Sequence, residues 1–165
     1  MTEDRDDLAR KIDLLVSQHQ MERKIFEVGY AIEKGDFQRV GELMGHATIG
    51  SDRQGRKTGG GSPEAIRDGY LKTNIVYPDR GRASKEIYHN ILVDIDLDDN
   101  RATSVTSYTV ALQPPGDPFE LLVAGMYEDE WERVDGEWRW VDRYVVVQYM
   151  NNLDKHMHSG SQPYN

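Results

Sequence analysis

The chain has 165 residues, which is the length of one ordinary domain and is enough to bury a single core. Its 29 acidic residues outnumber its 20 basic residues, so the net charge is −9 at pH 7. A negative surface disfavours binding to nucleic acid or to an anionic membrane, and we expect neither partner.

Features that the sequence lacks limit its chemistry and its location. No apolar run approaches the ~20 residues of a membrane span, and the start of the chain lacks the basic and apolar regions of a signal peptide. We therefore expect a cytoplasmic protein. The absence of cysteine excludes disulfides, thiolate nucleophiles and cysteine-based zinc sites. Catalysis would have to use carboxylates, histidine, tyrosine or a borrowed metal.

A long helix is predicted for residues 4–34. This segment has no proline and one glycine, and residues recur in it at helical spacing: Leu8, Ile12, Leu15, Phe26 and Gly29. We expect this stripe to face the interior, and we allow for a break near residues 18–20. Glu33 falls seven residues after Phe26, on the same stripe. The pattern therefore places a carboxylate beside the core.

Two shorter helices and a short strand follow. Gly35 and Asp36 end the first helix and cap a second helix over residues 37–44. Residues 46–51 predict a strand, and residues 52–61 predict a basic, glycine-rich loop. Ser62, followed by proline, predicts the start of a third helix that runs to about residue 77. The loop lacks the Lys-Ser/Thr ending of a P-loop, which argues against a phosphate site.

The second half of the chain predicts four antiparallel strands. Residues 87–97 alternate apolar and polar side chains, and a turn leads to a second strand over residues 102–112. Asp135-Gly136 is a strong hairpin signal between the last two strands, over residues 119–134 and 137–150. The sequence therefore predicts an α+β domain, a cone-shaped barrel in which three N-terminal helices pack on a strongly curled, mostly antiparallel sheet.

The closing hairpin carries a recognisable pattern: Gly125, Tyr127, Asp129, Asp135, Gly136, Trp138, Arg139 and Arg143. It resembles the closing hairpin of SnoaL-like proteins in the nuclear transport factor 2-like superfamily. Residues 30–37 and 61–66 resemble the end of the family's first helix and the start of a later one. The resemblance implies one SnoaL-like domain over residues 1–150. Residues 151–165 are then a polar tail, either a lid over a pocket or a disordered terminus.

The resemblance also implies an activity. Relatives such as scytalone dehydratase, hexachlorocyclohexane dehydrochlorinase and polyketide cyclases use an Asp and a His in the cone and need no cofactor. Here Glu33 stands at the Asp position and Glu86 at the His position. His89 lies on the opposite strand face, and it could replace that His only if a β-bulge shifted the register. Glu33 and His89 are therefore the predicted catalytic residues of a lyase or isomerase that acts by proton transfer.

Further polar residues are predicted to bind the substrate, a small apolar cyclic or aromatic compound. They are Tyr30, Tyr70, Asn74, Glu86, Thr106, Tyr108 and Tyr127. The three tryptophans, in contrast, are predicted to be core residues. No metal is predicted, because the acidic residues 94–99 depart from a calcium loop and the tail offers only His156 and His158 as ligands.

Two non-catalytic interpretations stay open beside the enzyme. One is a module that binds a small molecule or supports oligomerisation, and the other is the structural β subunit of an aromatic-ring dioxygenase. The last strand is apolar on both faces over residues 144–149. This feature predicts a homo-oligomer, either a dimer or a trimer.

Overall fold

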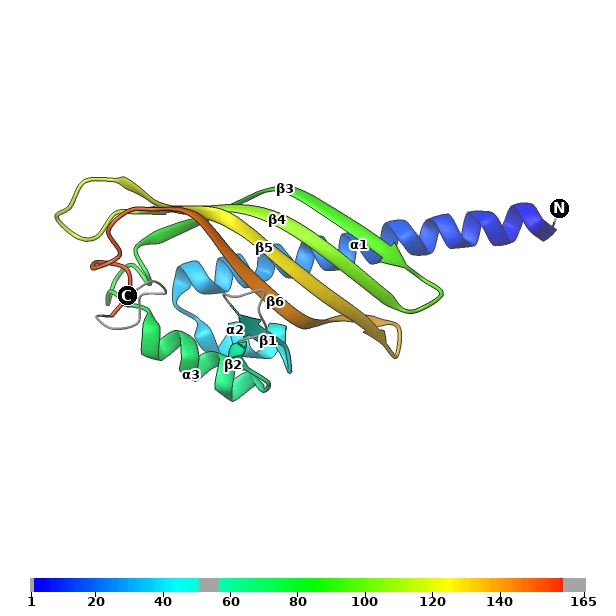
Figure 1. Cartoon of the computed structure of the whole chain (residues 1–165), viewed down its shortest axis with the longest axis horizontal. Coiled ribbons are helices and arrows are strands. Elements are labelled where there is room, and N and C mark those ends of the chain that lie inside the picture. Colours follow the sequence, from blue (N-terminus) through cyan, green and yellow to red (C-terminus); the bar gives the residue numbers. More distant parts are fainter. Residues whose placement is uncertain (1, 51–56, 159–165) are drawn as a thin grey trace.

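The computed structural model describes residues 2–50 and 57–158, in which three helices pack on one six-stranded mixed sheet (Figure 1). The predicted α+β class is confirmed. The helices are α1 (Thr2–Lys34), α2 (Phe37–Met44) and α3 (Pro63–Thr73). The strands are β1 (Thr48–Gly50), β2 (Lys57–Gly60), β3 (Ser84–Asp96), β4 (Arg101–Leu112), β5 (Glu120–Val134) and β6 (Glu137–Met150).

The sheet has the strand order β2-β1-β6-β5-β4-β3. The four predicted antiparallel strands form β3 to β6, and β1 joins them by pairing parallel to β6. Strand β2 lies within the predicted glycine-rich loop, and it pairs with β1 at the edge of the sheet. Residues 51–56 of that loop lie outside the described residues. Helix α3 ends earlier than predicted, because Asn74 leaves it to form a β-bridge with Met157.

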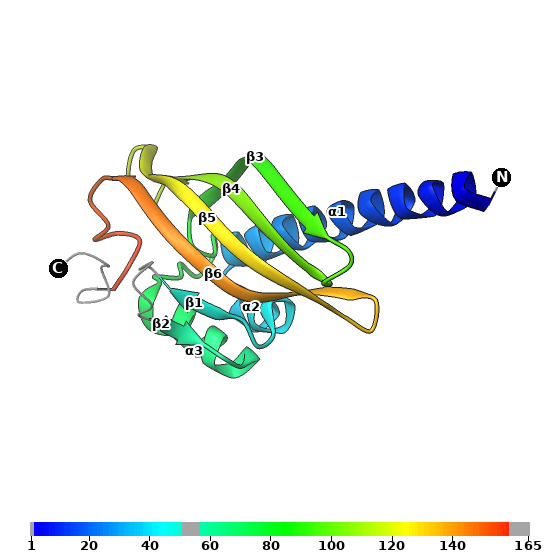
Figure 2. The same ribbon diagram turned by 45° about the vertical axis from the view of Figure 1, so that its right-hand side comes forward.

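Helix α1 is unbroken, and of the five residues of the predicted inward stripe only Gly29 is buried. Its buried stripe consists of Met21, Ile25, Val28, Ala31 and Ile32. Phe26 is 43% exposed, and Leu8, Ile12 and Leu15 are each more than half exposed. The prediction was wrong because two apolar stripes run along α1, and the sheet and α2 cover only one. The N-terminal turns also extend past the tips of the strands (Figure 2).

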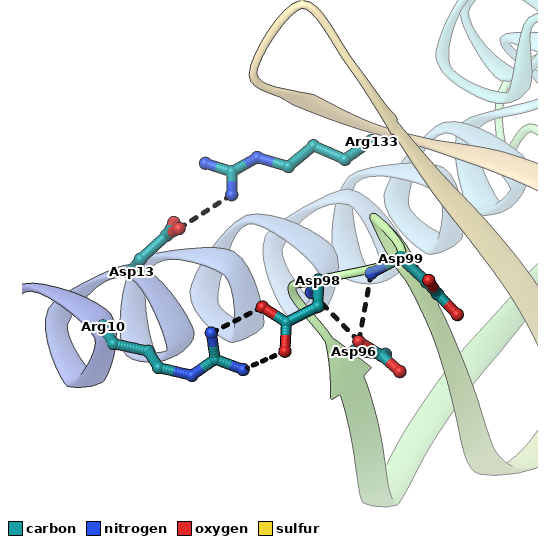
Figure 3. Close-up of polar contacts among 6 residues, drawn as sticks. All are labelled: Arg10, Asp13, Asp96, Asp98, Asp99 and Arg133. Carbon is teal, nitrogen blue, oxygen red and sulfur yellow. Dashed lines mark hydrogen bonds and ion pairs between the residues drawn. The ribbon is translucent and has the colours of Figure 1, made fainter. Parts of the chain in front are cut away.

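Two ion pairs fix the rotation of this helix (Figure 3). Arg10 donates two hydrogen bonds, of 2.8 and 2.9 Å, to the carboxylate of Asp98 in the turn after β3. Arg133, near the end of β5, donates a 2.8 Å hydrogen bond to Asp13. These contacts hold one side of the protruding turns against the hairpin tips, so the second apolar stripe faces away from the domain.

The hairpin of β5 and β6 supplies the centre of the core. Trp131, Trp138 and Trp140 are all buried, as predicted. The Trp131 indole N–H donates to Ser104 Oγ at 3.0 Å. Further from the hairpin turn than the tryptophans, Arg143 forms a fully buried ion pair with Asp129 through two hydrogen bonds of 2.7 and 2.8 Å. A buried pair of this kind joins the two strands and tolerates the loss of either partner poorly.

Candidate active site

A cavity of about 390 Å³ lies between α3, the curled inner face of the sheet and the segment that follows β6. Its wall is mostly apolar, with contributions such as Ile66, Val110 and Leu153. A smaller number of polar side chains also border it: Tyr70, Asn74, Arg82, Glu86, Tyr127 and His156. An apolar cavity of this size with a few polar groups is typical of a small-molecule site.

Three buried side chains at this wall form one hydrogen-bonded cluster, Arg82, Glu86 and His156. Arg82 Nη1 donates to Glu86 Oε1 at 2.7 Å, and Arg82 Nη2 lies 2.5 Å from His156 Nε2. A guanidinium can only donate, so the His156 Nε2 atom must accept. The imidazole is therefore neutral, with its proton on Nδ1.

Burial sets the protonation states in this cluster. It raises the pKa of the Glu86 carboxyl above its ordinary value, although Arg82 opposes the shift. Burial and the charge of Arg82 lower the pKa of His156 to about 3. Burial also holds the pKa of the Tyr127 hydroxyl well above its ordinary value, so this group stays protonated at neutral pH. Glu86 Oε2 has no hydrogen-bond partner among the described residues.

The C-terminal end of α1 supports the backbone of this cluster from outside the cavity. Glu33 Oε1 accepts a 2.9 Å hydrogen bond from the backbone N–H of Glu86, and Glu33 Oε2 accepts one of 2.8 Å from Lys85. The backbone N–H of Arg82 donates a 3.2 Å hydrogen bond to the backbone carbonyl of Glu33. Gly81 permits this approach, because its φ is +58° and a Cβ there would lie 2.6 Å from the Glu33 carbonyl oxygen.

The predicted pairing of Glu33 with His89 is wrong in its geometry. Strand β3 does contain a bulge, marked by Asn90 with φ +51° and by a register shift between His89 and Leu92. The bulge comes after His89, so Glu86 and Tyr88 face inward while His89 is exposed. Neither Glu33 nor His89 borders the cavity. Glu33 instead supports the backbone that carries Glu86.

Most of the predicted substrate-binding residues do border the cavity: Tyr70, Asn74, Glu86, Tyr108 and Tyr127. Tyr30 does not, because the residue is 59% exposed and its ring lies near the Lys85 ammonium on the outside of the domain. Thr106 is fully buried but is not part of the cavity wall. The residues that border the cavity come mainly from α3, from strands β3 to β6 and from the segment that follows β6.

Arg82 and His156 were missed in the sequence, because neither lies in a periodic pattern. Arg82 precedes β3 in a loop, and His156 belongs to the predicted tail. The tail segment 151–158 packs on the domain: the Ile75 N–H donates to the His156 carbonyl at 3.0 Å, and the His158 N–H donates to the Thr73 carbonyl at 2.9 Å. A hint was the pair of apolar residues Leu153 and Met157 in an otherwise polar stretch: Leu153 is buried, and both border the cavity.

Neither a metal site nor a membrane span is found in the part of the chain that the structure describes. Within residues 2–50 and 57–158, no three His, Cys, Asp or Glu side chains are grouped so that they could hold a metal ion. No helix in the same residues combines the length and the apolar character needed to cross a membrane.

A curled sheet that encloses a cavity against three helices defines an α+β cone, the class that includes proteins described as NTF2-like with a cystatin-like fold. Residues 15–144 match the model of the SnoaL-like domain, and the chain belongs to this family. A search of curated protein sequences found no match.

Solved structures resemble the chain at low identity. One is the hexachlorocyclohexane dehydrochlorinase LinA-type3 from Novosphingobium barchaimii, with a TM-score of 0.66, 18% identity and coverage of 91% of this chain and 95% of that one. Another is a scytalone dehydratase candidate from Novosphingobium aromaticivorans, with a TM-score of 0.65, 18% identity and coverage of 86% and 90%.

A third similar structure is the β subunit of a candidate aromatic-ring-hydroxylating dioxygenase from Novosphingobium aromaticivorans. Its TM-score is 0.63 at 12% identity, and the match covers 84% of this chain and 93% of that one. At such identities the three likenesses describe a shared fold.

Proposed function

We propose that the protein is a cofactor-independent enzyme of the dehydratase, isomerase or cyclase type, which moves a proton on a small, mostly apolar molecule. Glu86 is the proposed acid–base group. The observation that carries this proposal is the state of its carboxyl: it is buried at the wall of an apolar cavity, its Oε2 is unpartnered, and its pKa is raised. A raised pKa brings a carboxylate closer to the range where general bases work well.

The neighbouring residues have separate roles in this proposal. Arg82 binds Glu86 Oε1, which leaves Oε2 as the oxygen that receives the proton. Tyr70 and Tyr127 stay protonated, because burial raises the pKa of both hydroxyls, and so they can donate to a carbonyl or leaving group of the substrate. Glu33 is a positioning residue, because it binds the backbone N–H of Glu86 from outside the cavity.

The names of two similar structures support the type of reaction. A dehydrochlorinase and a dehydratase both perform eliminations, in which a base removes a proton and a leaving group departs. A single buried carboxylate can supply the proton-removing step.

Proton removal can be tested before the physiological substrate is known. The protein is incubated in D₂O with a panel of small cyclic ketones, and exchange of the hydrogens next to the carbonyl is followed by NMR. Wild type should exchange at least one ketone above the buffer rate, and Glu86→Gln should lower that rate by about 100-fold or more. His89→Gln is the control, because His89 is exposed and outside the cavity. Equal rates for wild type and Glu86→Gln would overturn the assignment.

A second candidate function is binding without turnover. Two observations favour it. His89 lies outside the cavity, and the Nε2 atom of His156 is occupied by Arg82, so among the described residues neither histidine is placed to exchange a proton beside Glu86. A pure binding protein would bind members of the panel with measurable affinity while wild type catalyses no exchange.

A further inference from the structure

The second apolar stripe of α1 has no cover among the described residues. Leu8, Ile12, Leu15 and Val16 are between 48% and 68% exposed along two turns and more of this helix. Helical spacing places Arg10 and Asp13 on the other side of the same turns, and their ion pairs, drawn in Figure 3, hold the stripe away from the domain. Such a patch on a rigid helix is a candidate interaction surface.

The spacing of this stripe indicates what kind of partner it fits. The positions alternate at intervals of three and four residues, which is the repeat of a coiled-coil seam: Arg5, Leu8, Ile12, Leu15, His19 and Glu22. Arg5 carries a positive charge at one end of the seam and Glu22 a negative charge at the other. A helix with this pattern is complementary to its own antiparallel copy.

We propose that α1 binds α1 of a second copy of this chain in antiparallel orientation. With Ile12 opposite Leu15 of the second copy, Leu8 lies opposite His19, and Arg5 lies opposite Glu22. The twofold symmetry repeats each of these contacts, so two ion pairs close the two ends of the apolar seam. Ala9 lies beside Val16 of the second copy on one flank.

Charge selects this orientation over the parallel one. A parallel pair in register would place Arg5 against Arg5 and Glu22 against Glu22, and like charges at a seam are unfavourable. The antiparallel pair replaces both repulsions with attractions. Glu22 already accepts a 2.7 Å hydrogen bond from Gln18 on its own helix, which holds the carboxylate on this face.

The helix is already formed before the two copies meet. Its inner face is packed on the core from Met21 to Ile32, and its outer turns are held by the hairpin tips. Association therefore does not bear the entropic cost of forming a helix, which limits isolated helices of this length. This inference is independent of the activity proposed above.

Charge exchange tests the pairing in the full-length chain. Sedimentation equilibrium should show reversible association of wild type, and Glu22→Arg should raise the dissociation constant by about tenfold or more, because Arg5 then faces arginine twice. The double variant Arg5→Glu with Glu22→Arg restores opposite charges, and it should return the constant to within about threefold of wild type. Failure of this restoration would overturn the antiparallel register.

A matched pair of substitutions tests the location of the surface. Leu15 and Leu92 are both 68% exposed, but Leu92 belongs to β3 and is not a seam position. Leu15→Asp should raise the dissociation constant by about 100-fold, since it would bury an unpaired carboxylate twice, and Leu92→Asp should not change it. A monomeric wild type at the highest soluble concentration would overturn the proposal. An association that Leu15→Asp leaves unchanged would do the same.

Discussion

The packing of His156 makes stability depend on pH in a defined direction. In the folded state its pKa is about 3, and in the unfolded chain it is near the ordinary value of 6.5. The folded pKa is the lower of the two, so the unfolded state takes up the proton first as the pH falls. The stabilisation is thus fully present above 6.5 and is lost progressively below it.

The size of the loss follows from these two values. At pH 5 the unfolded chain has gained about 1.5 pH units of protonation free energy that the folded chain has not. This difference favours unfolding by about 30-fold, or about 2 kcal/mol. Arg82 faces the ring, and Glu86 binds the other side of Arg82. Because its pKa is raised, Glu86 opposes part of the effect as the pH falls.

Comparison with His156→Gln isolates the histidine from Glu86 and from the surface carboxylates. Glutamine retains an oxygen that can accept from Arg82, but it does not titrate. Urea unfolding of both proteins is measured at pH 7.5 and 5 at one ionic strength. Wild type should lose about 2 kcal/mol more than the variant between these pH values. If both lose the same free energy of unfolding, His156 is not a buried neutral group.

Substitutions at three further positions test the supports of the site, each by its free energy of unfolding in urea. Gly81→Ala should cost about 2 kcal/mol or more, because its φ is positive and the added Cβ meets the Glu33 carbonyl; a cost below about 0.5 kcal/mol would contradict that contact. Asp129→Ala should cost about 3–5 kcal/mol, because it leaves Arg143 buried without its partner, and a neutral effect would contradict the buried pair. Glu33→Ala should cost about 1–2 kcal/mol, whereas Glu33→Gln, which keeps an acceptor for the Glu86 N–H, should cost less; equal costs would contradict that hydrogen bond.

The sequence contained enough information for the class of fold and for much of the cavity. Asp135-Gly136 sets the register of the β5–β6 hairpin, and its φ values of +52° and +82° are those that the turn requires. Tyr108, predicted from the sequence as a substrate-binding residue, does border the cavity from β4. The turn residues and the strand patterns are local features, so each can be recognised in one segment of the sequence.

The errors arose where tertiary packing decides. The apolar alternation over residues 87–97 predicts one continuous face, but a bulge at Asn90 exchanges the faces, so that His89 lies outside and Glu86 inside. On α1 two apolar stripes compete, and hydrophobicity alone does not say which one the sheet covers. His156 comes close to Arg82 only because the tail folds back on α3, a contact across 74 residues that leaves no local pattern.

The proposal that Glu86 is the acid–base group is tested most directly by measuring its pKa in the free protein. The side-chain carboxyl carbons are labelled with ¹³C, and the Glu86 signal is assigned by its absence in Glu86→Gln. Its chemical shift should titrate with a pKa above the ordinary value of 4.5. A pKa at or below that value would mean that the ion pair with Arg82 outweighs burial, and would contradict a role for Glu86 as the base.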